Sequence, residues 1–197
     1  MVIKRKFDYT EPTITAQAVD DSNQYLWLAF SQDVNGNCVL KKVSAFQPDQ
    51  VFFSLEIAVN EITAMQISGS YIYLAYDDDS LIGARYSTSS PLTSSIDFSI
   101  PSGITEAPVD LVIDNSTLFY LIPGNVSGTN SKVVEFTLTG TFVETIDLVK
   151  SGNIVTNASS IAVDTNSNLW LVTYTSPATL VRVYETGGFW DFTITIL

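Results

Sequence analysis

One pattern occurs four times along this chain and constrains its fold more than any other feature. In each copy a short apolar strand ends in Val or Ile, a polar turn follows, and a second apolar strand carries an aromatic residue. The copies read ITAQAVDDSNQYLWLAF, ITAMQISGSYIYLAY, VDLVIDNSTLFYLI and SSIAVDTNSNLWLVTY. The strand ends are Val19, Ile67, Ile113 and Val163, and the aromatic residues are Trp27, Tyr73, Phe119 and Trp170. Both sets recur about every 46 to 51 residues, so the chain is built from four copies of one structural unit.

Each unit is interpreted as four β-strands. Val, Ile, Thr, Tyr and Phe dominate the apolar runs, and Gly, Asn, Asp, Pro and Ser separate them, as strands and turns require. No ten-residue stretch has a helical period, so the fold class is all-β. A repeat of this length made only of strands is typical of a β-propeller blade. We therefore predict a four-bladed propeller of four-stranded antiparallel blades.

The predicted blades span about 14–57, 62–100, 109–148 and 159–197, after a basic N-terminal strand or arm at 1–13. Four blades would make the smallest closed propeller, but the sequence does not settle whether the ring closes within one chain. Part of a larger propeller, completed by another chain, is the first alternative. A β-sandwich is the second, although it would not explain the repeat.

The fourth copy supports the propeller through a family resemblance. Its segment SIAVDTNSNLWLV resembles the NHL and two-component-regulator propeller repeats over Ile161 to Val172, and the other copies resemble them more loosely. The usual turn glycine is replaced by Ser167, and the second copy has Ser68 in place of the Asp. The resemblance implies a propeller blade and does not imply a particular activity.

Composition limits the partners and the chemistry. The net charge of −12 disfavours nucleic-acid binding, and no apolar run approaches the length of a membrane span. The N-terminus lacks the apolar core of a signal peptide. The single cysteine, Cys38, is interpreted as a small packing residue. Without histidine there is no Ser-His-Asp triad, Cys-His pair or histidine metal site, and no nucleotide-binding glycine motif is present. We expect no cofactor.

Acidic residues are the remaining candidates for chemistry. The cluster Asp77, Asp78 and Asp79 could offer oxygen ligands to Ca²⁺, but it lacks calcium-loop spacing and is interpreted as a solvated turn. The recurrent residues Asp20, Asp114 and Asp164 could form an acidic ring or cap their own turns, and we favour caps. Asp110 differs, because the equivalent positions hold Ala16, Ala64 and Ser160. Since the first strand of a blade is innermost, Asp110 is a candidate contact in the central channel.

A partner-binding surface is predicted at the two ends of the chain. Three of the nine basic residues fall within the first six positions of an otherwise acidic chain. Residues 2–9 also read as a surplus strand, which would seek a partner for its backbone groups. The recurrent aromatic residues Trp27, Tyr73, Phe119 and Trp170 are interpreted as blade-packing residues, and Trp190 lies outside these aligned positions. The candidate partner-binding residues are Lys4, Arg5, Lys6, Phe7, Tyr9 and Trp190.

These observations favour a non-enzymatic structural or binding module that docks other protein subunits in a larger assembly, including further copies of itself. The Ser-, Thr- and Asn-rich acidic composition suggests a phage virion or tail component. The alternative is a calcium-dependent lactonase- or glycosidase-like propeller enzyme. Such an enzyme would need converging carboxylates at the channel, where only Asp110 is expected.

Overall fold

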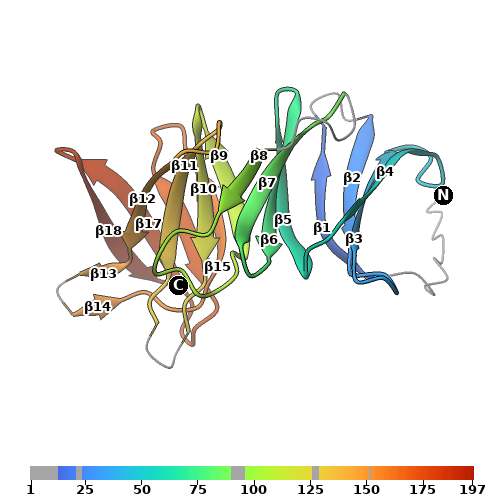
Figure 1. The fold of residues 1–197 in the computed structure, drawn as a ribbon. Coiled ribbons are helices and arrows are strands. Elements are labelled where there is room, and N and C mark those ends of the chain that lie inside the picture. Colours follow the sequence, from blue (N-terminus) through green and yellow to red (C-terminus); the bar gives the residue numbers. More distant parts are fainter. Residues whose placement is uncertain (1–12, 21–23, 90–95, 126–128, 151) are drawn as a thin grey trace.

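The computed structural model describes residues 13–20, 24–89, 96–125, 129–150 and 152–197, and all regular structure in these ranges is β-strand (Figure 1). The described residues include no helix with the length and hydrophobicity of a membrane span. The all-β prediction is confirmed. Strands form because Val, Ile, Leu and aromatic side chains alternate with polar ones or run continuously where both faces are covered.

Sixteen of the strands form four antiparallel four-stranded sheets, each in chain order. We call these sheets blades 1 to 4. Blade 1 contains β1 (Ile14–Val19), β2 (Tyr25–Phe30), β3 (Cys38–Ser44) and β4 (Val51–Ile57). Blade 2 contains β5 (Glu61–Ser68), β6 (Tyr71–Asp77), β7 (Leu81–Ser87) and β8 (Ile96–Ser99). Blade 3 contains β9 (Asp110–Asp114), β10 (Thr117–Ile122), β11 (Lys132–Thr137) and β12 (Phe142–Asp147).

Blade 4 contains β15 (Ala158–Val163), β16 (Leu169–Thr173), β17 (Thr179–Thr186) and β18 (Phe189–Ile196). A small hairpin, β13 (Val149–Lys150) and β14 (Asn153–Ile154), connects blade 3 to blade 4. The first strands of successive blades contact one another, β1 with β5, β5 with β9, and β9 with β15. The blades therefore stand side by side around one axis, as in a propeller.

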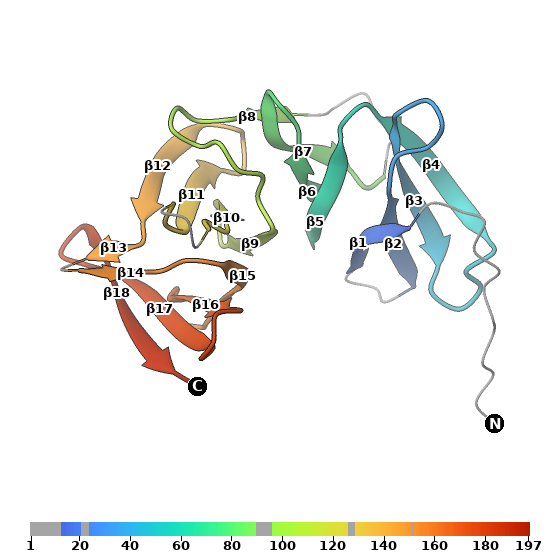
Figure 2. The same cartoon turned by 90° about the horizontal axis from the view of Figure 1, so that it is seen from below.

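The four blades form an open arc (Figure 2). Blade 1 and blade 4 stand at its two ends and leave a wide gap between them. The reason lies in the packing: each of the three hydrophobic clusters of the described residues joins one blade to the next, and none joins blade 4 to blade 1. The four described blades therefore do not form a closed four-bladed ring, and membership of a larger propeller, the first alternative, stays a prediction.

The recurrent aromatic residues explain how the blades pack. Trp27 lies in the cluster between blades 1 and 2, Tyr73 in that between blades 2 and 3, and Phe119 in that between blades 3 and 4. Their side chains are only 2%, 1% and 5% exposed. Each thus faces the following blade, which removes a large apolar area from water.

Polar groups fix the position of blade 3 against blade 2. The Tyr120 hydroxyl donates to the Leu74 carbonyl oxygen at 3.1 Å, and the Ile113 amide donates to Gln66 Oε1 at 2.9 Å. Burial, and then the nearby Tyr73, raise the pKa of Tyr120 well above its usual range, so the phenol remains a donor. Gly83 leaves the space that the Tyr120 ring occupies. These bonds fix the register between neighbouring blades.

Candidate functional site

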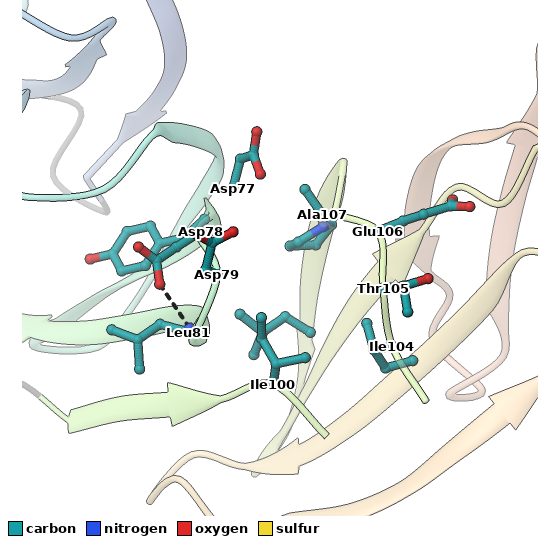
Figure 3. A pocket seen from close by; sticks show the side chains of 12 residues that line it. Asp77, Asp78, Asp79, Leu81, Ile100, Ile104, Thr105, Glu106 and Ala107 are labelled. Atoms are coloured by element: carbon teal, nitrogen blue, oxygen red, sulfur yellow. Dashed lines mark hydrogen bonds between the residues drawn. The ribbon is translucent and has the colours of Figure 1, made fainter. Parts of the chain in front are cut away.

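An acidic pocket opens between blade 2 and the segment that leads to blade 3 (Figure 3). Its volume is about 190 Å³. The end of β6 and the β6–β7 turn contribute one wall, and the segment 100–108 between β8 and β9 contributes the other. Ile82, Ile100, Ile104 and Pro108 are among its apolar lining residues. The predicted cluster Asp77, Asp78 and Asp79 lines the same pocket.

The Asp cluster is organised as a turn. Asp78 Oδ1 accepts hydrogen bonds from the Ser80 amide at 2.8 Å, the Ser80 hydroxyl at 2.9 Å and the Leu81 amide at 3.0 Å. Partial burial opposes ionisation of Asp78, but these bonds outweigh it and lower its pKa. Figure 3 shows the three carboxylates pointing in different directions. Among the described residues no three acidic, Cys or His side chains are grouped so that they could hold a metal ion.

Asp110 connects the innermost strands of blades 3 and 4. Its Oδ2 accepts the Ser160 hydroxyl and the Ile161 amide, both at 2.9 Å, and its Oδ1 accepts the Leu111 amide at 2.9 Å. The carboxylate is half-buried. These bonds explain why an acid stands here, because it satisfies donors of the next blade. The hydrogen bonds of Asp110 therefore have a structural role. Its predicted contact with a ligand in the central channel stays a prediction.

Asp20 and Asp164 lie in the turns between the first and second strands, whereas Asp114 ends β9 and its Oδ1 accepts the Asn115 side-chain amide at 2.9 Å. Asp20 Oδ1 accepts the amides of Gln24 and Tyr25, as the predicted cap requires. Asp164 accepts the Trp170 indole N–H at 2.9 Å as well as the Asn168 amide and side chain. These bonds, that from Trp170 foremost, hold the pKa of Asp164 far below its usual range. The turn therefore orients Trp170 on the face of blade 4.

Trp190, a predicted partner-binding residue, packs against blade 3. Its indole N–H donates to Glu144 Oε1 at 2.8 Å, and its ring meets the Phe119 ring edge to face at 6.0 Å between centroids. It also lines a surface groove of about 450 Å³ with Phe189, which is largely exposed, and Lys150. Partner binding by Trp190 stays a prediction. The other five candidates, Lys4, Arg5, Lys6, Phe7 and Tyr9, lie outside the described residues.

The outward faces of the two end blades form a feature that the sequence analysis missed. We call the outward face of blade 4 the leading flank; it carries Ala162, Trp170, Val172, Leu180 and Arg182. The outward face of blade 1 is the trailing flank; it carries Gln17, Val19, Leu26, Leu28 and Lys41. All ten side chains are exposed or half-buried. The sequence signal that could have revealed the leading flank is the position of Trp170 in the repeat. Its counterparts in blades 1 to 3 all face a following blade, and the described chain has no blade after blade 4.

Comparisons with known proteins show the fold. No family model and no curated protein matches the chain. The chain is similar to Kuenenia stuttgartiensis hydrazine synthase, with 14% identity and a TM-score of 0.65 over 92% of this chain and 53% of that one. It is also similar to the Myceliophteria thermophila Cps50 (Swd1) β-propeller domain, with 8% identity and a TM-score of 0.59 over 87% of this chain and 52% of that one.

A third similar structure is a putative 6-phosphogluconolactonase from Bacteroides uniformis, with 8% identity and a TM-score of 0.53 over 93% of this chain and 71% of that one. At these identities the likeness establishes a β-propeller fold. The resemblance to NHL and two-component-regulator repeats stays a prediction. The chain spans about half the length of the first two solved structures.

Proposed function

We propose that this chain is a non-enzymatic propeller module that docks other protein subunits in a larger assembly through its leading and trailing flanks. The supporting observation is that apolar positions buried in the other blades lie open on the end blades. Val172 is 38% exposed, whereas its counterparts Ala29, Ala75 and Leu121 are fully buried. Exposed apolar surface of this kind marks interaction sites.

The energetics favour a partner. Fully burying an apolar side chain contributes about 1.5–3 kcal/mol. The flanks hold several such side chains on the exposed faces of their sheets. Aromatic and arginine side chains, such as Trp170 and Arg182, are also the types that carry most binding energy in protein interfaces. That the assembly is a virion or a tail is a further part of this hypothesis, drawn from composition.

The alternative, a lactonase- or glycosidase-like enzyme, has one observation in its favour, the fold shared with a putative 6-phosphogluconolactonase. The carboxylates of this chain favour docking instead. Asp110 accepts bonds from Ser160 and Ile161, and Asp78 accepts three bonds within its own turn. Turnover of a lactone or glycoside by the purified chain, lost on Asp110→Asn without loss of folding, would favour the enzyme.

The docking function is tested by capture and chemical cross-linking in the native extract. The bait is the tagged wild-type chain, and the flank variant carries Val19→Lys and Ala162→Lys, so that each flank gains a charge of the same sign. The matched control is Val143→Glu, an exposed apolar residue on the outer strand of blade 3. We expect cross-linked partners with the wild-type and control chains and their loss with the flank variant. Identical capture by all three baits would contradict docking through the flanks.

A further inference from the structure

The trailing flank has the composition of a face that receives a preceding blade. Leu26 occupies the register position of Ile72, Leu118 and Leu169, and all three of these are fully buried by the preceding blade. Leu28 occupies the position of Leu74, Tyr120 and Leu171, which are also fully buried. In blade 1 both leucines are half-buried. At Gln17 and Lys41 this flank has polar side chains where blades 2 to 4 have apolar ones, and Ser54 and Glu56 on β4 add two exposed polar side chains to the same face.

The leading flank has the composition of a face that covers a following blade. Trp170 occupies the position of Trp27, Tyr73 and Phe119, yet it is only half-buried. Arg182 occupies the position of Arg85, whose Nη1 donates to the Leu138 carbonyl oxygen of blade 3 at 2.7 Å. Arg182 stands over the Trp170 and Tyr184 rings, as Arg85 stands over the Tyr71 ring. The two flanks are thus the two complementary halves of one repeated interface.

We infer that a second copy of this chain occupies the flanks, joined head to tail. The leading flank of each copy covers the trailing flank of the other, which closes a ring of eight blades about a two-fold axis. This inference rests on the proposed docking function and identifies its partner. The length of the chain is consistent with this pairing. One chain spans 53% and 52% of two solved structures, so two copies together match about the whole length of either one.

We call the contact between the leading flank of one copy and the trailing flank of the other a seam. The repeated interface predicts which residues meet at each seam. Gln66 on β5 accepts the Ile113 amide of the next blade. The same register positions across the seam are Ala162 on the leading flank and Val19 on the trailing flank. Both are exposed, and Val19 is 52% exposed. The counterpart of Leu138 is Ala45, whose carbonyl oxygen is the predicted acceptor for Arg182 of the other copy.

Light scattering after size exclusion measures the first consequence. At about 100 μM chain, well above a micromolar dissociation constant, we expect twice the chain mass of 21.6 kDa. Val19→Lys and Ala162→Glu, each alone, should give the mass of one chain, because each places a charge in both seams. Val143→Glu should remain a dimer. Circular dichroism confirms that every variant is folded.

Mixing the two flank variants distinguishes head-to-tail pairing from other dimers. A dimer of one Val19→Lys chain and one Ala162→Glu chain has one unchanged seam and one seam with opposite charges, so the mixture should recover the dimer mass. Cysteine provides a second measurement: Val19→Cys and Ala162→Cys chains, mixed and oxidised, should cross-link to each other and not to themselves. Cys38 is buried and supplies the unchanged background.

Each outcome decides the proposal. A monomeric wild-type chain at this concentration overturns the second copy as occupant. If the flank-dependent capture described above is nevertheless retained, the docking function stands and its partner is another protein. Head-to-tail pairing is overturned if Val19→Lys and Ala162→Glu, each alone, still give the dimer mass. It is also overturned if Val19→Cys chains, or Ala162→Cys chains, cross-link to copies of themselves.

Discussion

Replacing Gly83 with alanine tests how blades 2 and 3 fit together. Gly83 lies on β7, where an added Cβ would overlap the Leu74 carbonyl oxygen and the Tyr120 hydroxyl and would lie 2.9 Å from Tyr120 Cζ. Tyr120 is fully buried and cannot move toward solvent. The methyl group would therefore force the phenol away from the Leu74 carbonyl, with which it forms its hydrogen bond.

Two effects set the magnitude for Gly83→Ala. Overfilling a packed core costs about 1–3 kcal/mol. A buried hydroxyl that loses its partner costs a further ~1–3 kcal/mol. We therefore expect the free energy of unfolding to fall by about 2–6 kcal/mol, a large part of the roughly 5–15 kcal/mol typical of a domain. Since 1 kcal/mol shifts the melting temperature of a chain this long by about 2–4 °C, the expected fall is roughly 4–24 °C.

Thermal and urea unfolding followed by circular dichroism provide the measurement, with Tyr120→Phe as the second arm of a double-mutant cycle. Removing the phenol oxygen removes one of the overlapping atoms. Gly83→Ala should then cost at least 1 kcal/mol less, by this estimate, in the Tyr120→Phe background than in the wild type. Equal costs in both backgrounds, or a wild-type melting temperature for Gly83→Ala, would refute the assigned fit.

Three further predictions follow from the blade faces and turns. Trp27→Ala should destabilise the chain by about 3–5 kcal/mol in urea unfolding, whereas Trp170→Ala should cost clearly less in dilute solution, where no second copy covers it; equal losses would place Trp170 in a core. Asp110→Ala should lower the free energy of unfolding by about 1–3 kcal/mol, while Asp110→Ser, which retains an acceptor oxygen, should recover part of that loss. The depressed pKa of Asp164 means that its contribution to stability is present above the pKa of an unfolded Asp, about 3.9, and is lost as the pH falls through the lower folded value. The melting temperature of Asp164→Asn should accordingly fall less steeply below about pH 4 than that of the wild type. The same fall in both proteins would contradict this role of the Asp164 carboxylate.

Much of the fold could be predicted from the sequence because blades repeat their packing. The aromatic residue of each second strand must face the following blade, so its spacing located Trp27, Tyr73 and Phe119 correctly in the inter-blade clusters. The same reasoning placed Trp170 in a core. It lies on an open flank instead, because nothing in the local pattern says whether another blade follows.

The site was less predictable because it depends on contacts between distant residues. Asp110 stood out as an exception to its repeat, but its bonds to Ser160 and Ile161, some 50 positions away, required the packed blades. The turn formed by Asp78 followed from local chemistry, since Asp commonly bonds the backbone two or three residues ahead. Closure of the ring depends on the angle between blades, which no single residue determines.

The open arc has a consequence for how the chain opens and exchanges its amide hydrogens. Blades 2 and 3 are each covered on both faces, whereas blades 1 and 4 are each covered on one. In a structure whose units contact only their neighbours, the free energy of opening is close to a sum of unit and interface contributions. In dilute solution, where no second copy covers them, the end blades should therefore unfold and refold while the middle pair persists, which gives slow exchange in β6 and β10 and faster exchange in β2 and β16. A protease that cuts in the end blades would leave the central pair as the last resistant fragment.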